Sequence, residues 1–311
     1  MDEVQINISE NEILRSSPEL LRELLRDHTT GKNIFWATHD YEELGAEYSY
    51  HSPILPELIT GERGMVIRPR VLKSKEAQTG RAKEMAEVFT PSWICDAQNN
   101  LVDEALLSQQ GGKGWQDYVS ATVLEITCGE APYLVSRYDA TTGEAIPIDR
   151  RVGLLDRKLR MVSAHVDDSD EWQEWAQVAY KNTYGYEWQG DNLLLAREAL
   201  LWSFMEYYEA KFGTMPTVSS LICIAEIISW NLWQMDGLKG VVPDSCHDVV
   251  SRNPSVQQLD FFATDIPEAS TPKVTPCPGC QQDDLCKHNG TYCKIKDWDT
   301  GKEIRFIDLL Q

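Results

Sequence analysis

Residues 119–132 read VSATVLEITCGEAP, and this stretch decides the expected fold. An apolar run is followed at once by the small-residue turn Thr127-Cys128-Gly129. Such a run predicts a buried strand, and glycine lets the chain turn tightly where the strand ends. A tight turn at this place allows a ligand to approach the backbone at the carboxyl edge of an open α/β sheet.

Strand and helix signals alternate downstream of this turn, after a charged insert at residues 137–183. The second strand ends on Glu187, an acid that can accept hydrogen bonds from ribose hydroxyls. Gly213 ends the first helix. This alternation predicts a doubly wound α/β sheet of the Rossmann-like kind. The expected elements are a strand at 182–188, helices at 190–212 and 218–229, and a strand within 231–238.

Composition divides the chain into four parts. An N-terminal extension with a helix in SPELLRELLRDH, from Ser17, precedes the sheet domain. A linker rich in Pro, Ser, Asp and Thr then leads to a cysteine-rich segment. The turn formers Asp299-Thr300-Gly301-Lys302 predict a C-terminal hairpin. The expected parts are residues 1–84, 85–240, 241–276 and 277–311.

The charge balance is strongly acidic, with 29 basic and 49 acidic residues and a formal net charge of −20. A phosphate backbone binds basic surfaces, so we expect a partner chain to make most of any contacts with DNA. The basic stretch between Arg68 and Lys83 is interpreted as a solvated face. The sequence has no run of eighteen apolar residues, and its N-terminus is acidic and polar. These features predict neither a membrane anchor nor a secretory signal, so a cytoplasmic location is expected.

The C-terminal cysteines predict a structural zinc site. Cys277-Pro-Gly-Cys280 is a turn in which two thiolates can bind one ion, and further ligands follow within a few residues. A loop of free thiols or a redox pair is the alternative. The ligands we favour are Cys277, Cys280, Cys286 and Cys293, with His288 or Cys246 as alternatives for the fourth position.

Four segments in a fixed order carry a resemblance to a known family. They are Phe89-Thr90-Pro91, Leu124-Glu125 with Gly129, Gly185-Tyr186-Glu187 with Ala196-Arg197, and Asn231 with Asp236. Together they resemble the gamma group of adenine-N6 DNA methyltransferases, and most closely the M subunit of split restriction–modification systems. The resemblance spans roughly half of the chain. It implies a methyltransferase sheet that is incomplete in this chain and that binds S-adenosylmethionine.

The resemblance also implies roles for individual residues. The first segment would line the methionine end of the cofactor, the turn would lie beneath its amino-acid portion, Glu187 would bind the ribose, and Asp236 would lie near the adenine ring. The cofactor residues so implied are Phe89, Thr90, Pro91, Glu125, Gly129, Ala131, Glu187 and Asp236.

The Asn-Pro-Pro-aromatic segment that holds the target base in this family has no counterpart in the sequence. The resemblance therefore implies no catalytic residue in this chain and a second subunit, a methyltransferase or nuclease chain, that carries the catalytic loop. Two alternatives stay open. Ala131, Pro132 and Met235 stand where the family has other residues, which favours an inactive scaffold subunit. The cofactor half is also shared with methyltransferases that act on RNA or protein.

Overall fold

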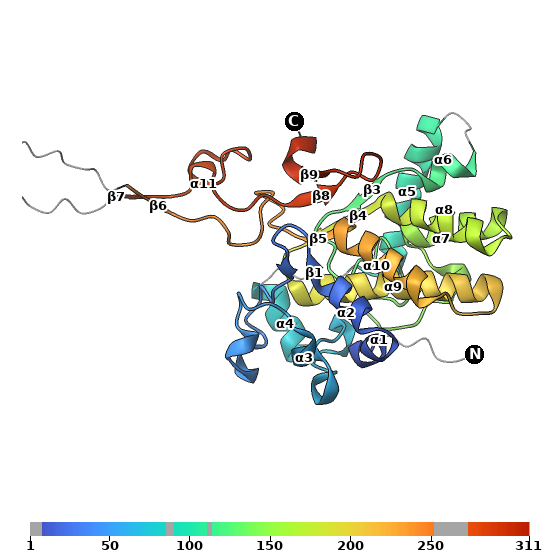
Figure 1. Cartoon of the computed structure of the whole chain (residues 1–311), viewed down its shortest axis with the longest axis horizontal. Coiled ribbons are helices and arrows are strands. Elements are labelled where there is room, and N and C mark those ends of the chain that lie inside the picture. Colours follow the sequence, from blue (N-terminus) through green and yellow to red (C-terminus); the bar gives the residue numbers. More distant parts are fainter. Residues whose placement is uncertain (1–7, 85–89, 111–113, 252–272, 311) are drawn as a thin grey trace, which may run out of the picture.

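The computed structural model describes residues 8–84, 90–110, 114–251 and 273–310 (Figure 1). Its strands are β1 (Arg26–Asp27), β2 (Lys32–Asn33), β3 (Val123–Glu125), β4 (Thr183–Glu187), β5 (Leu232–Gln234), β6 (Val249–Ser251), β7 (Lys273–Thr275), β8 (Lys294–Lys296) and β9 (Glu303–Arg305). The main helices are α1 (Glu10–Ser16), α2 (Pro18–Leu25), α3 (Pro56–Ile59), α4 (Lys75–Glu84), α5 (Ser92–Gln110), α6 (Trp115–Val119), α7 (Leu154–His165), α8 (Ser169–Lys181), α9 (Gly190–Phe212), α10 (Val218–Asn231) and α11 (Pro278–Gln282). Within the described ranges, no helix combines the length and the apolar character that a bilayer crossing requires.

Three short parallel strands form the central sheet, in the order β3-β4-β5. Consecutive strands are joined through helices, α7 and α8 in the first crossover and α9 and α10 in the second. The prediction of strands alternating with helices is thus confirmed, and the chain has a mixed α/β fold. Because the strands are parallel, the turn after β3 and the ends of β4 and β5 lie at one edge of the sheet.

The first crossover differs from the expected charged insert, because it contains two complete helices, α7 and α8. The carboxylate of Asp168 caps α8 by accepting hydrogen bonds from the backbone N–H groups of Asp170 and Glu171. Each helix buries a stripe of apolar side chains beneath a charged outer face. The high charge of the segment therefore marks the solvent side of a helical layer.

Helix α9 lies in the middle of the molecule and is buried on nearly all sides along its first four turns. It contacts α2, α7, α10, β4 and β5. Its predicted end is confirmed, since Gly213 caps it in the left-handed conformation, with φ 69°. The N-terminal helix expected from Ser17 is also present as α2, and it packs against α10. The N-terminal residues therefore share the hydrophobic core of the sheet.

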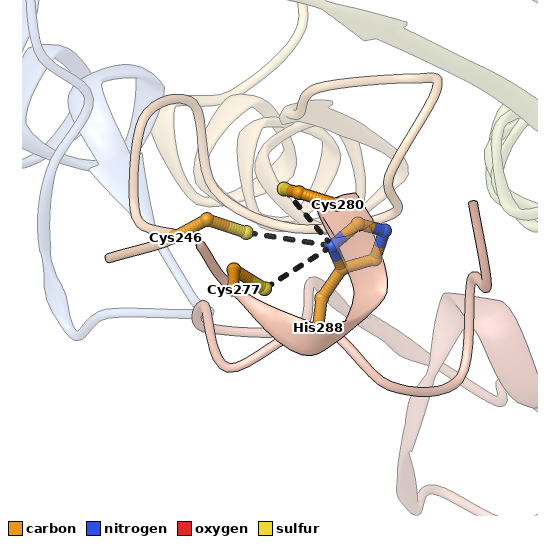
Figure 2. Close-up of side chains that lie close together, drawn as sticks. All are labelled: Cys246, Cys277, Cys280 and His288. Carbon is orange, nitrogen blue, oxygen red and sulfur yellow. Dashed lines mark hydrogen bonds between the residues drawn. The ribbon is translucent and has the colours of Figure 1, made fainter. Parts of the chain in front are cut away.

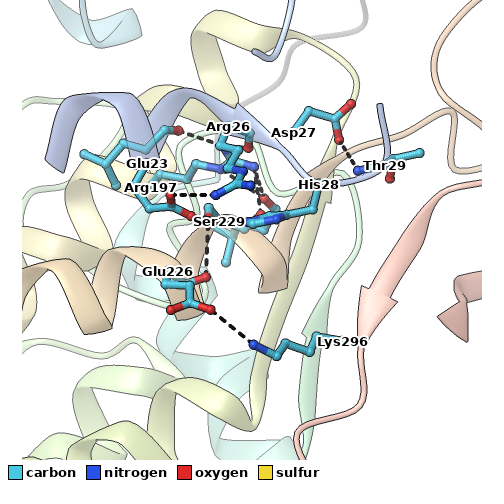
Figure 3. A network of polar contacts seen from close by, with 11 residues as sticks. Glu23, Arg26, Asp27, His28, Thr29, Arg197, Glu226, Ser229 and Lys296 are labelled. Carbon is cyan, nitrogen blue, oxygen red and sulfur yellow. Dashed lines mark hydrogen bonds and ion pairs between the residues drawn. The ribbon is translucent and has the colours of Figure 1, made fainter. Parts of the chain in front are cut away.

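Arg197 holds the start of β5 and the N-terminal segment together (Figure 3). Its buried guanidinium donates hydrogen bonds to the carbonyl oxygens of Leu232, Ser229, Leu24 and Arg26, at 2.6–3.1 Å. A buried arginine without a carboxylate partner is tolerated only when its donors are satisfied in this way. The Ala-Arg pair singled out in the sequence thus has a structural role.

The two faces of the sheet are covered differently. Val123 and Leu232 point into the core that the helices form, whereas Tyr186 and Trp233 lie on the opposite face. The hairpin β8–β9 covers this second face, with Ile295 packed among its aromatic side chains. The hairpin turn predicted at Asp299-Thr300-Gly301-Lys302 is confirmed by this pairing.

A two-stranded ribbon, β6 paired with β7, projects away from the rest of the molecule (Figure 1). It lies in the stretch expected to be a linker, of which residues 252–272 fall outside the described part. Val250 and Val274 face one another across the ribbon and are both exposed. The ribbon leads directly into the cysteine-rich segment.

Candidate functional site

Four metal-binding side chains converge at the base of the ribbon (Figure 2). The Nδ1 atom of His288 lies 3.5 Å from Sγ of Cys246, 3.7 Å from Sγ of Cys277 and 3.6 Å from Sγ of Cys280. All four ligand atoms lie within 4.8 Å of one another. Cys246 comes from the loop after β5, and the other three residues come from the segment around α11. This cluster can hold a metal ion.

Local backbone geometry builds the cluster. Pro278 lies between the two cysteines and begins the short helix α11, which contains Cys280. This turn brings the two thiols to one side. A Cβ at Gly279 would lie 2.6 Å from both N and Nδ1 of His288, so only glycine allows this close approach. Although burial opposes ionisation, backbone N–H groups, among them that of Asn289, lower the pKa of the Cys277 thiol to about 6. Such N–H donors favour the thiolate that binds metals.

The structure corrects two of the four favoured ligands. Cys277 and Cys280 belong to the cluster, whereas Cys286 is exposed in a turn and is not part of it. Cys293 is buried under the hairpin, where its thiol donates to the carbonyl oxygen of Gln234 at 3.4 Å. The backbone of Cys293 is tied to Gly240, which directs its side chain toward the sheet and away from the cluster.

Two residues considered only as alternatives, Cys246 and His288, complete the cluster. No local spacing identifies Cys246, because it lies far upstream of the Cys-Pro-Gly-Cys turn and the ribbon brings it back. For His288 a signal was present, since it is an imidazole ligand that follows the Cys277–Cys280 turn within a few residues. The preference for thiols over imidazole led the prediction to Cys286 and Cys293.

The expected cofactor residues meet at the carboxyl edge of the sheet. The backbone N–H of Gly129, in the turn after β3, donates to Oε2 of Glu187 at the end of β4, at 2.7 Å. Oε1 of Glu187 accepts from the backbone N–H groups of Trp188 and Gln189, at 2.9 and 3.2 Å. Burial raises the pKa of Glu187, although these N–H groups act in the opposite direction. The turn and the acid are thus joined directly.

The turn itself has the expected tight geometry. Thr127, Gly129 and Ala131 all have positive φ, at 47°, 54° and 60°, and Ala131 is fully buried. The backbone N–H of Tyr133 donates to Oε1 of Glu125 at 3.4 Å. Burial raises the pKa of Glu125 well above its ordinary range, and the nearby charge of Glu187 adds to this effect.

The segment around Thr90 and Pro91 lies beside this turn. The thiol of Cys95 donates to the carbonyl oxygen of Thr90 at 3.7 Å. Burial raises the pKa of Cys95 to about 12, and the nearby carboxylate of Glu125 contributes to the rise. The carbonyl of Pro91 accepts the first helical hydrogen bonds of α5. Phe89, the remaining predicted residue of this segment, lies outside the described residues.

Asp236 is buried in the loop after β5. Its Oδ2 lies 3.0 Å from Nζ of Lys239, and its Oδ1 accepts from the backbone N–H of Leu238 at 3.1 Å. This pairing fixes the loop that continues to Cys246 of the metal cluster. The structure thus brings Asp236 to the edge where Glu187 ends, and it engages both acids in hydrogen bonds within the chain.

An open cavity of about 500 Å³ lies near these acids. Tyr50, one of its lining residues, accepts a hydrogen bond from Nε1 of Trp188, the neighbour of Glu187, at 2.9 Å. Burial raises the pKa of Tyr50 to about 12, and the charges of Asp244 and Asp236 contribute to the rise. These residues carry no local sequence signal, because only the fold brings Asp244 beside residues 39–51. The lining residues are His39, Glu42, Ser49, Tyr50, His51 and Asp244.

The basic stretch before the first motif is partly buried, in contrast to the expected solvated face. Arg81 donates to Oδ2 of Asp191 at 2.9 Å and to Oε1 of Gln189 at 2.6 Å. Lys73 lies 3.2 Å from the same Asp191 oxygen. Asp191 stands in the first turn of α9, where a carboxylate is favoured by the helix dipole. Two of these cations therefore stabilise the fold.

Comparison with protein-family models, with curated proteins and with solved structures finds no match for this chain in any of the three. Any function assigned to the chain therefore rests on its residues and on the geometry described above.

Proposed function

We propose that this chain is the S-adenosylmethionine-binding subunit of a split DNA adenine-N6 methyltransferase of a restriction–modification system. The observation that carries the proposal is the contact between Gly129 and Glu187. It joins the turn after the first parallel strand to the acid at the end of the next strand, which is the arrangement a nucleotide-type ligand requires. The carboxyl-edge position of Asp236 supports the same assignment.

The chemistry of the site fits a ribose. The oxygens of Glu187 accept hydrogen bonds only from N–H donors of the backbone within the described residues. A carboxylate oxygen can accept more than one hydrogen bond, so a ribose hydroxyl can donate to Oε2 of Glu187 beside the N–H of Gly129. The open cavity lined by Tyr50 would then lie on the side of Trp188 and Asp236, where an adenine ring needs room.

The reaction divides between two polypeptides in this proposal. This chain binds and orients the cofactor, whose bound sulfonium supplies the methyl group. The partner chain binds DNA, extrudes the target adenine and holds its amine in line with the methyl group. Methyl transfer between a sulfonium and an amine depends on positioning, so a chain that lacks the base-binding loop should not methylate DNA alone.

Zinc is the metal we propose for the cysteine–histidine cluster. Bond lengths of about 2.3 Å to sulfur and about 2.0 Å to nitrogen place the S and N corners of a zinc tetrahedron about 3.5 Å apart. The three Sγ–Nδ1 distances of 3.5–3.7 Å agree with this value. Four protein ligands leave no open position, so the ion would be structural.

Calorimetric titration of the full chain with S-adenosylmethionine tests the cofactor assignment. We expect binding, and we expect Glu187→Gln to weaken it about 10- to 100-fold, the equivalent of the 1.5–3 kcal/mol of a hydrogen bond to a charged group. The matched control is Glu174→Gln, on the exposed face of α8. Circular dichroism confirms that each variant is folded. Absence of heat with both S-adenosylmethionine and S-adenosylhomocysteine would contradict the proposal.

One observation favours a second candidate, an inactive scaffold subunit. Both oxygens of Glu187 are already satisfied by backbone N–H groups, and Asp236 is already paired with Lys239. Such contacts would hold the edge of the sheet together without any ligand. The same titration separates the candidates, because a scaffold binds no cofactor while still associating with its partner.

A further inference from the structure

The loop after β5 joins the carboxyl edge of the sheet to the metal cluster. Asp236 stands near its start, and Cys246 ends it as a member of the cluster (Figure 2). Backbone hydrogen bonds hold the loop along its length. The N–H of Asp236 donates to the carbonyl oxygen of Val241 at 2.8 Å, and the N–H of Val242 donates to that of Thr291 at 2.8 Å. The position of one end of the loop therefore bears on the other.

A tight turn directly before Cys246 places Asp244 at its corner. Pro243 is the second residue of the turn, and Asp244, with a positive φ of 54°, is the third, which is the pattern of a type II turn. The N–H of Ser245 closes the turn by donating to the carbonyl oxygen of Val242 at 3.1 Å. Because the proline ring and this hydrogen bond restrict the turn, the position of Cys246 determines that of Asp244.

Asp244 forms part of the wall of the open cavity of about 500 Å³, opposite residues 39–51. Burial raises the pKa of Tyr50 to about 12, and a side-chain hydrogen bond with Asp244 adds to the rise. The hydroxyl of Tyr50 accepts from Nε1 of Trp188 at 2.9 Å, and the backbone N–H of Trp188 donates to Oε1 of Glu187 at 2.9 Å. Direct contacts thus lead from the turn to the acid at the end of β4.

A bound ion would dominate the position of Cys246. The other contacts at this end of the loop are made by Asn289, whose side chain accepts from the N–H of His247 at 3.1 Å and donates to its carbonyl oxygen at 2.7 Å. Both hydrogen bonds are exposed, and each is weak beside the coordination of a structural zinc ion. Metal occupancy therefore decides how firmly Cys246 and Asp244 are held.

We propose that the metal cluster controls the cavity lined by Tyr50. With an ion bound, Cys246 fixes the turn and Asp244 completes the cavity wall, whereas loss of the ion releases both. The edge at Glu187 would then respond to metal availability through Tyr50. By linkage, a ligand that requires the completed wall would raise the affinity of the cluster for its ion. This inference rests on the zinc assignment of the proposed function and not on the cofactor assignment.

Fluorine nuclear magnetic resonance tests this coupling. The full chain is labelled with 3-fluorotyrosine, the signal of position 50 is assigned with Tyr50→Phe, and spectra are recorded with bound zinc and after chelation. We expect the signal of Tyr50 to move on chelation. The signals of Tyr180 on α8 and Tyr207 on α9, both buried in the core, should stay in place. An unchanged signal at Tyr50, or loss of the native signals at all three positions, would overturn the proposal.

Two matched variants test whether Asp244 carries the coupling. Asp244→Gly removes the carboxylate and suits the positive φ, so the turn should keep its shape. Asp283→Gly makes the same change at the end of α11, at an exposed residue with a φ of 50° that does not line the cavity. We expect both variants to bind zinc, and only Asp244→Gly to abolish the response of Tyr50 to chelation. A response that persists in Asp244→Gly, or that disappears in Asp283→Gly, would overturn the proposal.

Metal analysis of the same samples separates this inference from the proposed function. No S-adenosylmethionine is added, so a failed cofactor assignment leaves the result unaffected. Zinc uptake without a response at Tyr50 overturns this inference alone. A chain that takes up no zinc contradicts the zinc assignment and this inference together.

Discussion

The backbone N–H of Gly129 donates a hydrogen bond of 2.7 Å to Oε2 of Glu187, across 58 positions of sequence. This contact and the two other N–H hydrogen bonds to Glu187 should stabilise the fold itself, in addition to shaping a ligand site. Glu187→Ala should lower the free energy of unfolding by about 1–3 kcal/mol, because it leaves buried donors unsatisfied. Urea denaturation measures the change, with Glu174→Ala on α8 as the control. An equal stability of the two variants would contradict this role.

Stability should also depend on pH through a pair of buried glutamates. Burial raises the pKa of Glu10, on α1, to about 8, and it raises the pKa of Glu198, on α9, well above its ordinary range, with the charge of Glu10 adding to the effect. The folded protein favours the protonated form of a carboxyl group whose pKa rises on folding, so that protonation of the group stabilises the fold. The contribution of Glu10 is complete below about pH 4.5 and is lost as the pH rises through 8, and that of Glu198 is lost in the same direction.

Replacing Glu198 tests this dependence. Glu198→Gln should raise the free energy of unfolding at pH 9 by about 1–3 kcal/mol, because it removes the cost of a buried charge without a partner. At pH 5 the two proteins should differ much less. Urea denaturation at both pH values gives the comparison, and Glu174→Gln serves as the exposed control. A difference that does not change between pH 5 and pH 9 would show that ionisation is not the cause.

Metal removal should loosen the C-terminal segment. We expect about one equivalent of zinc in the purified chain, by atomic emission, as four-ligand structural sites hold one ion. Chelation should increase amide hydrogen exchange between Cys277 and His288 and around Cys246, because the ligands join these segments. Cys280→Ser should lose the metal, whereas Cys286→Ser should keep it. Loss of zinc in the Cys286 variant alone would favour the ligand set expected from the sequence.

The glycine between the two cysteines offers a more subtle test. Gly279→Ala places a Cβ 2.6 Å from Nδ1 of His288, so the imidazole must move although every ligand is retained. We expect metal affinity to fall about 10- to 100-fold, the range seen when groups that position ligands are changed. Competition with a chromophoric chelator measures the affinity. Gly80→Ala, in α4 with open space around it, is the control and should bind zinc normally.

The sequence predicted those parts of the fold that local patterns determine. The strand at 182–188, the helix ended by Gly213 and the C-terminal hairpin all have signals within a few residues, and the structure confirms each of them. The helices α7 and α8 were missed because their exposed faces carry so many charges that the segment resembled an insert. Burial of the first turns of α9 on all sides also could not be foreseen, since it depends on the N-terminal helices packing over them.

The same distinction applies to the candidate sites. The turn from Cys277 to Cys280 has a local signal, and both residues belong to the cluster. Cys246 joins them only because the pairing of β6 with β7 brings the chain back beside it. The number of residues between Cys246 and Cys277 does not predict this contact. Likewise, Arg81 appears in the sequence as one of several surface cations, whereas Asp191 on a distant helix makes it a buried partner.

The ribbon β6–β7 leaves the body just after one ligand of the metal cluster and returns just before another. Residues 247–251 and 273–276, which flank the part of the chain that is not described, therefore meet the body of the protein at one place. Doubling the length of a loop with fixed ends costs only about 0.6 kcal/mol. An inserted peptide or a fluorescent reporter next to Ser251 or Lys273 should therefore leave the fold intact, and it would allow the chain to be followed in solution.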